Sequence, residues 1–121
     1  MCGIFTLISN AGIFDKEFIN DKFLKGQKRG PEFSKLLEVL NDNINNNNLD
    51  IYFGFHRLAI NGLNEEGNQP IIIDNIMLVC NGEIYNYEHL FITMGIDPKT
   101  TSDCEIIIHL YKKYGIEHTL S

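Results

Sequence analysis

The order of apolar runs and turn signals limits most strongly what this 121-residue chain can fold into. β-branched and aromatic runs predict strands, whereas apolar residues spaced three and four apart predict helices. The predicted elements are, in order, a strand over 4–8, helices over 14–23 and 33–44, a strand over 51–60, a hairpin over 71–80, and helices over 87–94 and 103–114. This order favours one α+β domain over a parallel βαβ fold.

Turn and capping residues set the ends of these elements. Asp15 is the predicted N-cap of the first helix, and Thr101 or Ser102 that of the last. Asn-rich segment 41–48 is predicted to be an exposed loop, and Asn81-Gly82 a sharp turn. The predicted core face of the last helix consists of Ile106, Ile107, Leu110 and Tyr114, with Gly115 ending the helix.

Charge and hydropathy exclude several classes of function. The net charge is −6, and the one basic cluster, 25–29, is typical of a solvated helix end rather than of a nucleic-acid site. No apolar run approaches the roughly 20 residues of a membrane span, and the first residues lack the basic-then-apolar pattern expected of a leader. We expect no nucleic-acid partner, no membrane association and a cytoplasmic location.

The three cysteines do not form a metal or disulfide pattern. Their number is odd and no C-x-x-C pair occurs, so neither a zinc site nor a disulfide framework is expected. Cys80 and Cys104 lie in apolar or helical surroundings and are predicted to be buried, inert thiols.

Cys2 differs because it directly follows the initiator Met1. Removal of Met1 would leave a thiol and a free α-amino group on one residue. Since an α-amino group titrates at about 7.7–8.0, it can act as the base for that thiol near neutral pH. A Met-Cys start also occurs by chance, so this feature alone does not establish a nucleophile.

Six short motifs follow one another along the chain. They are 1–5 (MCGIF), 29–32 (RGPE), 57–60 (RLAI), 68–70 (NQP), 81–86 (NGEIYN) and 102–105 (SDCE). In this order they resemble the class II glutamine amidotransferase domain, an N-terminal-nucleophile hydrolase, and within it the glutaminase domain of glutamine-hydrolysing asparagine synthetases. The resemblance covers nearly the whole chain, 2–121, and implies an αββα sandwich of mostly antiparallel sheets.

The resemblance also implies roles for particular residues. Cys2 would be the nucleophile, with the Asn81 side chain and the Gly82 backbone N–H forming an oxyanion hole. The guanidinium fork of Arg57 would bind the α-carboxylate of glutamine, and the carboxylates of Glu83 and Asp103 would bind its α-ammonium group. Leu58 and Ile60 would present backbone groups to the substrate.

Structural alternatives exist for these positions. Arg57 could instead form a surface ion pair, and Asp103 could simply begin a helix. Asn81-Gly82 could be a plain turn. His56 is predicted to be a half-buried structural histidine, because it points away from the Arg57 face of its strand. Arg29 and the Gly30-Pro31 bend would shape the wall near Cys2. Tyr85 and Tyr87 are predicted to pack in the core or a turn.

The chain departs from the resembled family in two ways. That domain normally continues by further strands and a synthetase domain, so we expect a C-terminally truncated fold with an uncovered apolar face and unpaired sheet edges. The spacing between Arg29 and Arg57 is also longer than usual.

Two functions remain open at this stage. The first is a glutaminase that needs no metal or cofactor, with ATP and Mg used only by a synthetase domain absent from this chain. The second is a non-catalytic remnant that binds glutamine or docks a partner.

Overall fold

The computed structural model describes residues 2–39, 48–58 and 65–121. The chain divides into two compact units, residues 1–63 and 64–121. Each contains one antiparallel sheet and at least one helix, so the predicted α+β class with antiparallel sheets is confirmed.

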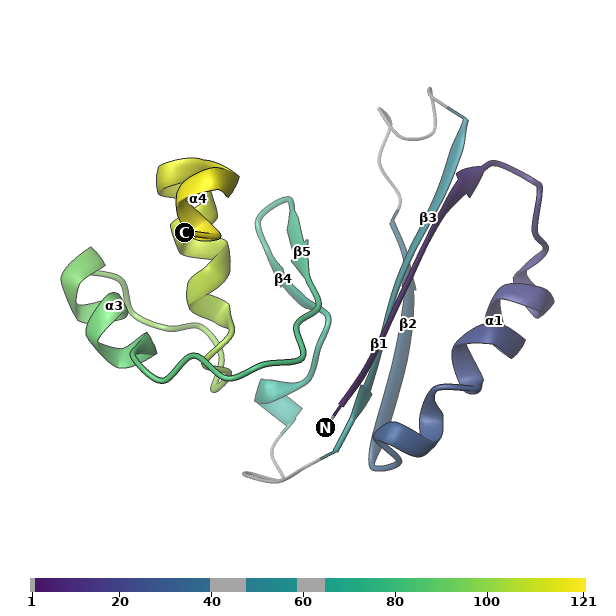
Figure 1. Cartoon of the computed structure of the whole chain (residues 1–121), viewed down its shortest axis with the longest axis horizontal. Coiled ribbons are helices and arrows are strands. Elements are labelled where there is room, and N and C mark those ends of the chain that lie inside the picture. The colour runs from purple at the N-terminus through teal and green to yellow at the C-terminus, as the bar shows by residue number, and fades with distance from the viewer. Residues whose placement is uncertain (1, 40–47, 59–64) are drawn as a thin grey trace. The chain divides into compact units, whose positions relative to one another are not determined.

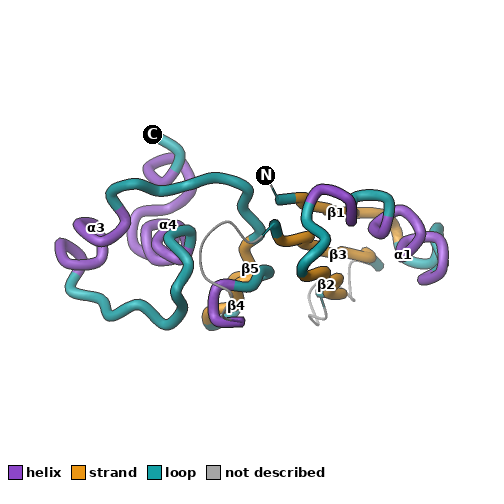
Figure 2. Tube along the Cα trace, turned by 90° about the horizontal axis from the view of Figure 1, so that it is seen from below, coloured by secondary structure: helices purple, strands orange, loops and turns teal. Residues whose placement is uncertain are grey.

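The first unit is a three-stranded sheet with a helix on one face (Figures 1 and 2). Its strands are β1 (Gly3–Asn10), β2 (Phe33–Glu38) and β3 (Leu49–Arg57), in the order β1-β3-β2. Helix α1 (Lys16–Leu24) begins where predicted, because Asp15 accepts the Phe18 N–H at 2.7 Å. The 3₁₀ turn η1 (Gln27–Arg29) then leads into Gly30.

Helix α1 is fixed to the sheet by one aromatic side chain. The buried Phe23 ring stacks on the His56 ring at 4.1 Å and meets Phe5 edge-on at 5.9 Å. Gly54 lies beneath it, since a Cβ there would stand 2.6 Å from the Phe23 ring. The α1 face of the sheet is therefore its packed face.

The predicted helix over 33–44 is wrong where the structure describes it. Residues Phe33–Glu38 form strand β2, which pairs antiparallel with β3 from Phe33↔Arg57 to Glu38↔Tyr52. The Asn-rich loop predicted over 41–48 falls almost entirely outside the described residues.

The second unit combines a hairpin with two helices. Strands β4 (Ile71–Ile73) and β5 (Ile76–Leu78) pair antiparallel, as predicted, and the 3₁₀ turn η2 (Glu65–Gly67) precedes them. Helix α3 (Tyr87–Met94) ends at Gly95, whose φ of 66° is left-handed. Helix α4 (Glu105–Thr119) carries a non-helical break at Gly115.

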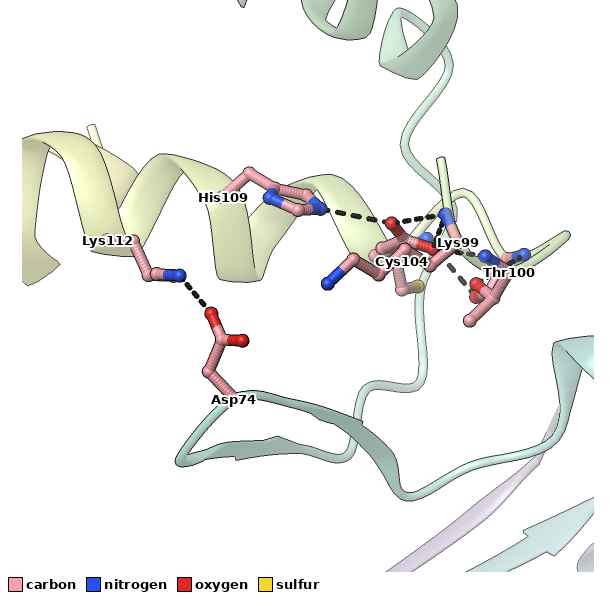
Figure 3. Close-up of polar contacts among 8 residues, drawn as sticks. Asp74, Lys99, Thr100, Cys104, His109 and Lys112 are labelled. Carbon is pink, nitrogen blue, oxygen red and sulfur yellow. Dashed lines mark hydrogen bonds and ion pairs between the residues drawn. The ribbon is translucent and has the colours of Figure 1, made fainter. Parts of the chain in front are cut away.

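The core of the second unit lies between the hairpin and α4. Ile71, Ile73, Cys104 and Ile108 form one buried cluster. Ile106 is buried as predicted, but Tyr114 is 47% exposed, so the predicted core face is wrong at that position. Lys112 on α4 pairs with Asp74 in the hairpin turn (Figure 3).

Candidate glutaminase site

Cys2 lies at the end of the first unit's sheet, beside the last residues of β3. The Leu58 N–H donates to Cys2 Sγ over an N···S distance of 3.4 Å. The β1–β3 ladder ends at Gly3↔His56, so Cys2 and Arg57 are the next residues along the two paired strands. The first unit thus brings three predicted site residues, Cys2, Arg57 and Leu58, to one sheet end.

Residues Arg29 and Gly30 lie against the same sheet end. A Cβ at Gly30 would stand only 2.3 Å from the His56 carbonyl oxygen, so the bend after η1 is in direct contact with the β3 backbone. A Cβ at Gly3 would stand 3.4 Å from Arg29 Cβ. This position agrees with the predicted role of the bend as a wall near Cys2.

His56 does not serve Cys2 as a base. The ring is 1% exposed rather than half-buried, and its Nε2 lies 2.8 Å from the Phe23 carbonyl oxygen, which can only accept. Nε2 therefore carries the proton, and Nδ1 accepts the Ser34 hydroxyl at 2.7 Å. Because both ring nitrogens are engaged, His56 is structural, as the sequence indicated.

The second group of predicted site residues lies in the second unit, in an exposed segment after β5. Asn81, Gly82 and Glu83 are all solvent-exposed. The segment is anchored just before Asn81, where the Cys80 N–H donates to Gln69 Oε1 at 2.6 Å. Gln69 is only 5% exposed. Sequence reasoning gave Gln69 no role, although the NQP motif contains it.

Asp103 ties this segment to the start of α4. Its Oδ2 accepts the Ile84 N–H at 2.6 Å, and Cys104 Sγ lies 3.8 Å from the Gly82 carbonyl oxygen. Asp103 precedes the helix, which begins at Glu105. The second unit therefore brings Gly82, Glu83 and Asp103 into one region, and Asp103 is more than a helix-start residue.

Glu105 organises the loop before α4. Its side chain is fully buried and accepts the N–H groups of Lys99 and Thr100 at 2.9 and 2.6 Å and pairs with His109 Nε2 at 3.0 Å (Figure 3). Burial alone would raise the pKa of Glu105. The hydrogen bonds outweigh it, so this pKa lies below the usual 4.5 and the carboxylate stays charged.

The structure corrects several further predictions. Tyr85 is 86% exposed rather than packed, whereas Tyr87 meets Phe91 edge-on at 6.5 Å. The N-cap of α4 is Cys104 instead of Thr101 or Ser102, although the Ser102 hydroxyl accepts the Cys104 N–H at 3.3 Å. Ile60 lies outside the described residues.

The described residues contain neither a metal-binding cluster nor a membrane-spanning helix. No cluster of three or more His, Cys, Asp or Glu side chains suited to a metal ion occurs within 2–39, 48–58 and 65–121. In that part of the chain, no helix has both the length and the apolar character needed to cross a membrane.

Comparison with known proteins identifies the class of domain. The family model described as "Glutamine amidotransferase domain" matches residues 1–121, so the chain belongs to that family. The resemblance inferred from the six motifs is thereby confirmed.

The curated relatives of the chain include glutamine-hydrolysing asparagine synthetases. The chain is 36% identical over 124 residues to the probable asparagine synthetase [glutamine-hydrolyzing] of Acanthamoeba polyphaga mimivirus, covering 100% of this chain and 22% of that protein. It is 35% identical over 124 residues to the asparagine synthetase [glutamine-hydrolyzing] of Gallus gallus, covering 100% of this chain and 20% of that protein. The chain thus spans about a fifth of the length of these relatives.

Proposed function

We propose that residues 2–121 form a type 2 glutamine amidotransferase domain that hydrolyses glutamine to glutamate and ammonia, with Cys2 as nucleophile after removal of Met1. The observation that carries this proposal is the position of Cys2 Sγ, 3.4 Å from the Leu58 N–H and at the same sheet end as Arg57. The backbone of Leu58 thus holds the Cys2 sulfur at the end of the sheet that also carries Arg57.

In the proposed reaction the α-amino group of Cys2 accepts the thiol proton, and the thiolate attacks the side-chain carboxamide carbon of glutamine. Asn81 and Gly82 donate to the oxygen that gains negative charge. The C–N bond then breaks as the α-ammonium group returns the proton to the leaving ammonia. Water attacks the resulting thioester and releases glutamate.

The substrate would be held by its backbone charges. Arg57 offers a planar fork to the α-carboxylate, and Glu83 and Asp103 offer negative charge to the α-ammonium group. Backbone groups of Leu58 and Ile60 would complete the contacts. This half-reaction requires no metal or nucleotide.

The ammonia would be used by a synthetase domain or chain to make asparagine, as the names of the relatives suggest. ATP and Mg would act only in that synthetase reaction. The proposal includes a cytoplasmic location, where a free thiol is maintained.

The direct test is a coupled glutamate assay on the 121-residue chain with glutamine. We expect turnover that Cys2→Ala abolishes, with Cys2→Ser keeping at most a trace. Turnover that is unchanged in Cys2→Ala would contradict the proposal. Glutamine binding without turnover, in a folded chain that has lost Met1, would favour the non-catalytic remnant instead.

A further inference from the structure

Two thiols outside the proposed reaction lie against each other in the second unit. Cys80 follows β5 and Cys104 is the N-cap residue of α4, and both sulfurs border Gly82. Cys104 Sγ lies 3.8 Å from the Gly82 carbonyl oxygen, and a Cβ at Gly82 would stand 3.7 Å from Cys80 Sγ. Both are free thiols. Cys104 belongs to the buried apolar cluster between the hairpin and α4, and Cys80 packs against that cluster. The folded unit therefore holds together two sulfurs that are 24 residues apart in the chain.

The two thiols differ in access and in acidity. Cys104 is 2% exposed, whereas Cys80 is partly exposed and can be reached by a small molecule. The hydrogen bond from Cys104 lowers the pKa of Cys80 to about 7, and the same bond together with burial raises the pKa of Cys104. A partly exposed thiol of low pKa beside a second thiol is the usual arrangement of a redox-sensitive pair. The predicted burial is confirmed for Cys104 but is wrong for Cys80, which is only partly buried.

We propose that Cys80 and Cys104 form an oxidation site at which a small-molecule disulfide converts the two thiols into an intramolecular disulfide. The Cys80 thiolate attacks one sulfur of the reagent, whose S–S bond breaks and releases one small thiolate. The Cys104 sulfur then attacks Cys80 Sγ in the mixed disulfide and displaces the second small thiolate, which takes up the Cys104 proton and leaves as a thiol. One reagent disulfide is thus reduced to two thiols while the protein gains one disulfide.

This oxidation acts on the segment that carries Asn81 and Gly82. Cys104 Sγ lies 3.8 Å from the Gly82 carbonyl oxygen, and Cys80 directly precedes Asn81. Forming the S–S bond removes the Cys104 thiol proton from beside the Gly82 carbonyl oxygen and Cys80 Sγ, and it draws Cys80 toward α4. The effect of this change on activity rests on the proposed function. Displacing Asn81 and Gly82, the proposed oxyanion-hole donors, would slow glutamine hydrolysis.

The chemical test uses the Cys2→Ala chain, in which Cys80 and Cys104 are the remaining cysteines, with oxidised glutathione as the probe. Non-reducing peptide mapping by mass spectrometry should find residues 80 and 104 in one cross-linked species, without retained glutathione. With Cys104→Ser added, the product should be a stable mixed disulfide on Cys80. With Cys80→Ser added, Cys104 should remain unmodified.

Several results would overturn the proposal. These are free alkylation of both thiols after treatment, a stable mixed disulfide on Cys80 with Cys104 intact, or a cross-link between two chains. The same reaction in denaturing urea is the control for folding. An intramolecular disulfide that forms as fast in urea as in the native chain would mean that the fold does not create the site.

The effect on activity is measured separately in the chain that retains Cys2. Oxidation at 80 and 104 should lower glutamate release about ten-fold or more, and a dithiol reductant should restore it. Cys104→Ser, compared before and after the same treatment, should lose less activity. A disulfide with unchanged turnover would overturn the link to Gly82. A disulfide in a chain without turnover in either redox state would contradict the proposed function and leave the oxidation site supported.

Discussion

Cys2 and His56 lie close to each other along paired strands, yet their side chains contact different groups. His56 uses one ring nitrogen for the Phe23 carbonyl and the other for the Ser34 hydroxyl. Cys2 Sγ instead faces the backbone of Leu58. This difference supports the proposal that the α-amino group of Cys2, rather than an imidazole, accepts the thiol proton.

Arg57→Lys tests whether the guanidinium fork binds the substrate carboxylate. Lysine keeps the charge but cannot make two parallel hydrogen bonds, so KM for glutamine should rise about ten-fold or more, with a smaller change in kcat. Steady-state kinetics measure both values. Lys35→Arg, at an exposed position of β2, is the control and should change neither. An unchanged KM in Arg57→Lys would exclude this role.

Glu105→Gln tests the buried carboxylate that holds the loop before α4. Glutamine presents an NH₂ group toward the N–H donors of Lys99 and Thr100, so the variant should lose about 2–3 kcal/mol of unfolding free energy at neutral pH. Urea denaturation measures the loss. Glu117→Gln, at an exposed position of the same helix, is the control and should change stability little.

The same variant has a defined pH dependence. The folded pKa of Glu105 is depressed, so its stabilisation is present above the unfolded value near 4.5 and is lost as the pH falls through the folded value. The unfolding free energy of the unmodified chain should therefore fall below pH 4.5 more steeply than that of Glu105→Gln. Parallel curves for the two proteins would contradict this account.

At the scale of elements, strong local signals predicted the structure well. The Asp15 cap, the hairpin within 71–80 and the end of the helix over 87–94 all occur where the sequence placed them. Each depends on a residue type with one dominant backbone role. Such signals need no knowledge of the tertiary contacts.

Strand β2 shows where local signals failed. Its apolar residues follow helical spacing, but the segment is short and its backbone pairs with β3. Both faces of β2 make contacts, since Ser34 and Glu38 reach His56 and Lys16 from one face while Leu37 and Phe33 lie on the other. Because both faces of β2 make contacts, polar and apolar residues do not strictly alternate along it. Only the pairing with β3 therefore determines that the segment is a strand.

Gly30→Ala tests the close approach of the η1 bend to β3. The new methyl group would lie 2.3 Å from His56 O and 2.5 Å from the Arg57 carbonyl carbon, both of which are backbone atoms. We expect a loss of about 3 kcal/mol in unfolding free energy, measured by urea denaturation. Glutamate release should fall as well, because Arg57 and Leu58 adjoin the strained backbone.

Gly12→Ala is the matched control for this substitution. A Cβ at Gly12 meets nothing within 4 Å, so only its positive φ of 76° adds cost, about 1 kcal/mol. If Gly30→Ala is no more destabilising than Gly12→Ala, the bend is not held against β3 as described.

At the scale of the molecule, the sequence named candidate site residues but not the contacts that hold them. The motifs named Cys2, Arg57, Asn81 and Asp103, and the structure shows local partners that no motif revealed. Gln69 anchors the segment before Asn81, and the Cys80–Cys104 contact borders Gly82. Such partners are separated in sequence, so they emerge only when the chain is folded.

Exposed apolar surface was also expected and is present. Ile4 and Ile8 on β1 are 53% and 65% exposed, and alternate with residues of the packed face. Within the described sheet β1 and β2 are edge strands.

The most direct test of the central claim is the mass of the chain quenched with acid during turnover of glutamine. The account predicts a chain that lacks Met1 and carries one γ-glutamyl group, which peptide mapping locates on Cys2 as a thioester. The adduct should be absent from Cys2→Ala. Glutamate release by a chain that retains Met1, or that carries the adduct on another residue, would contradict the account.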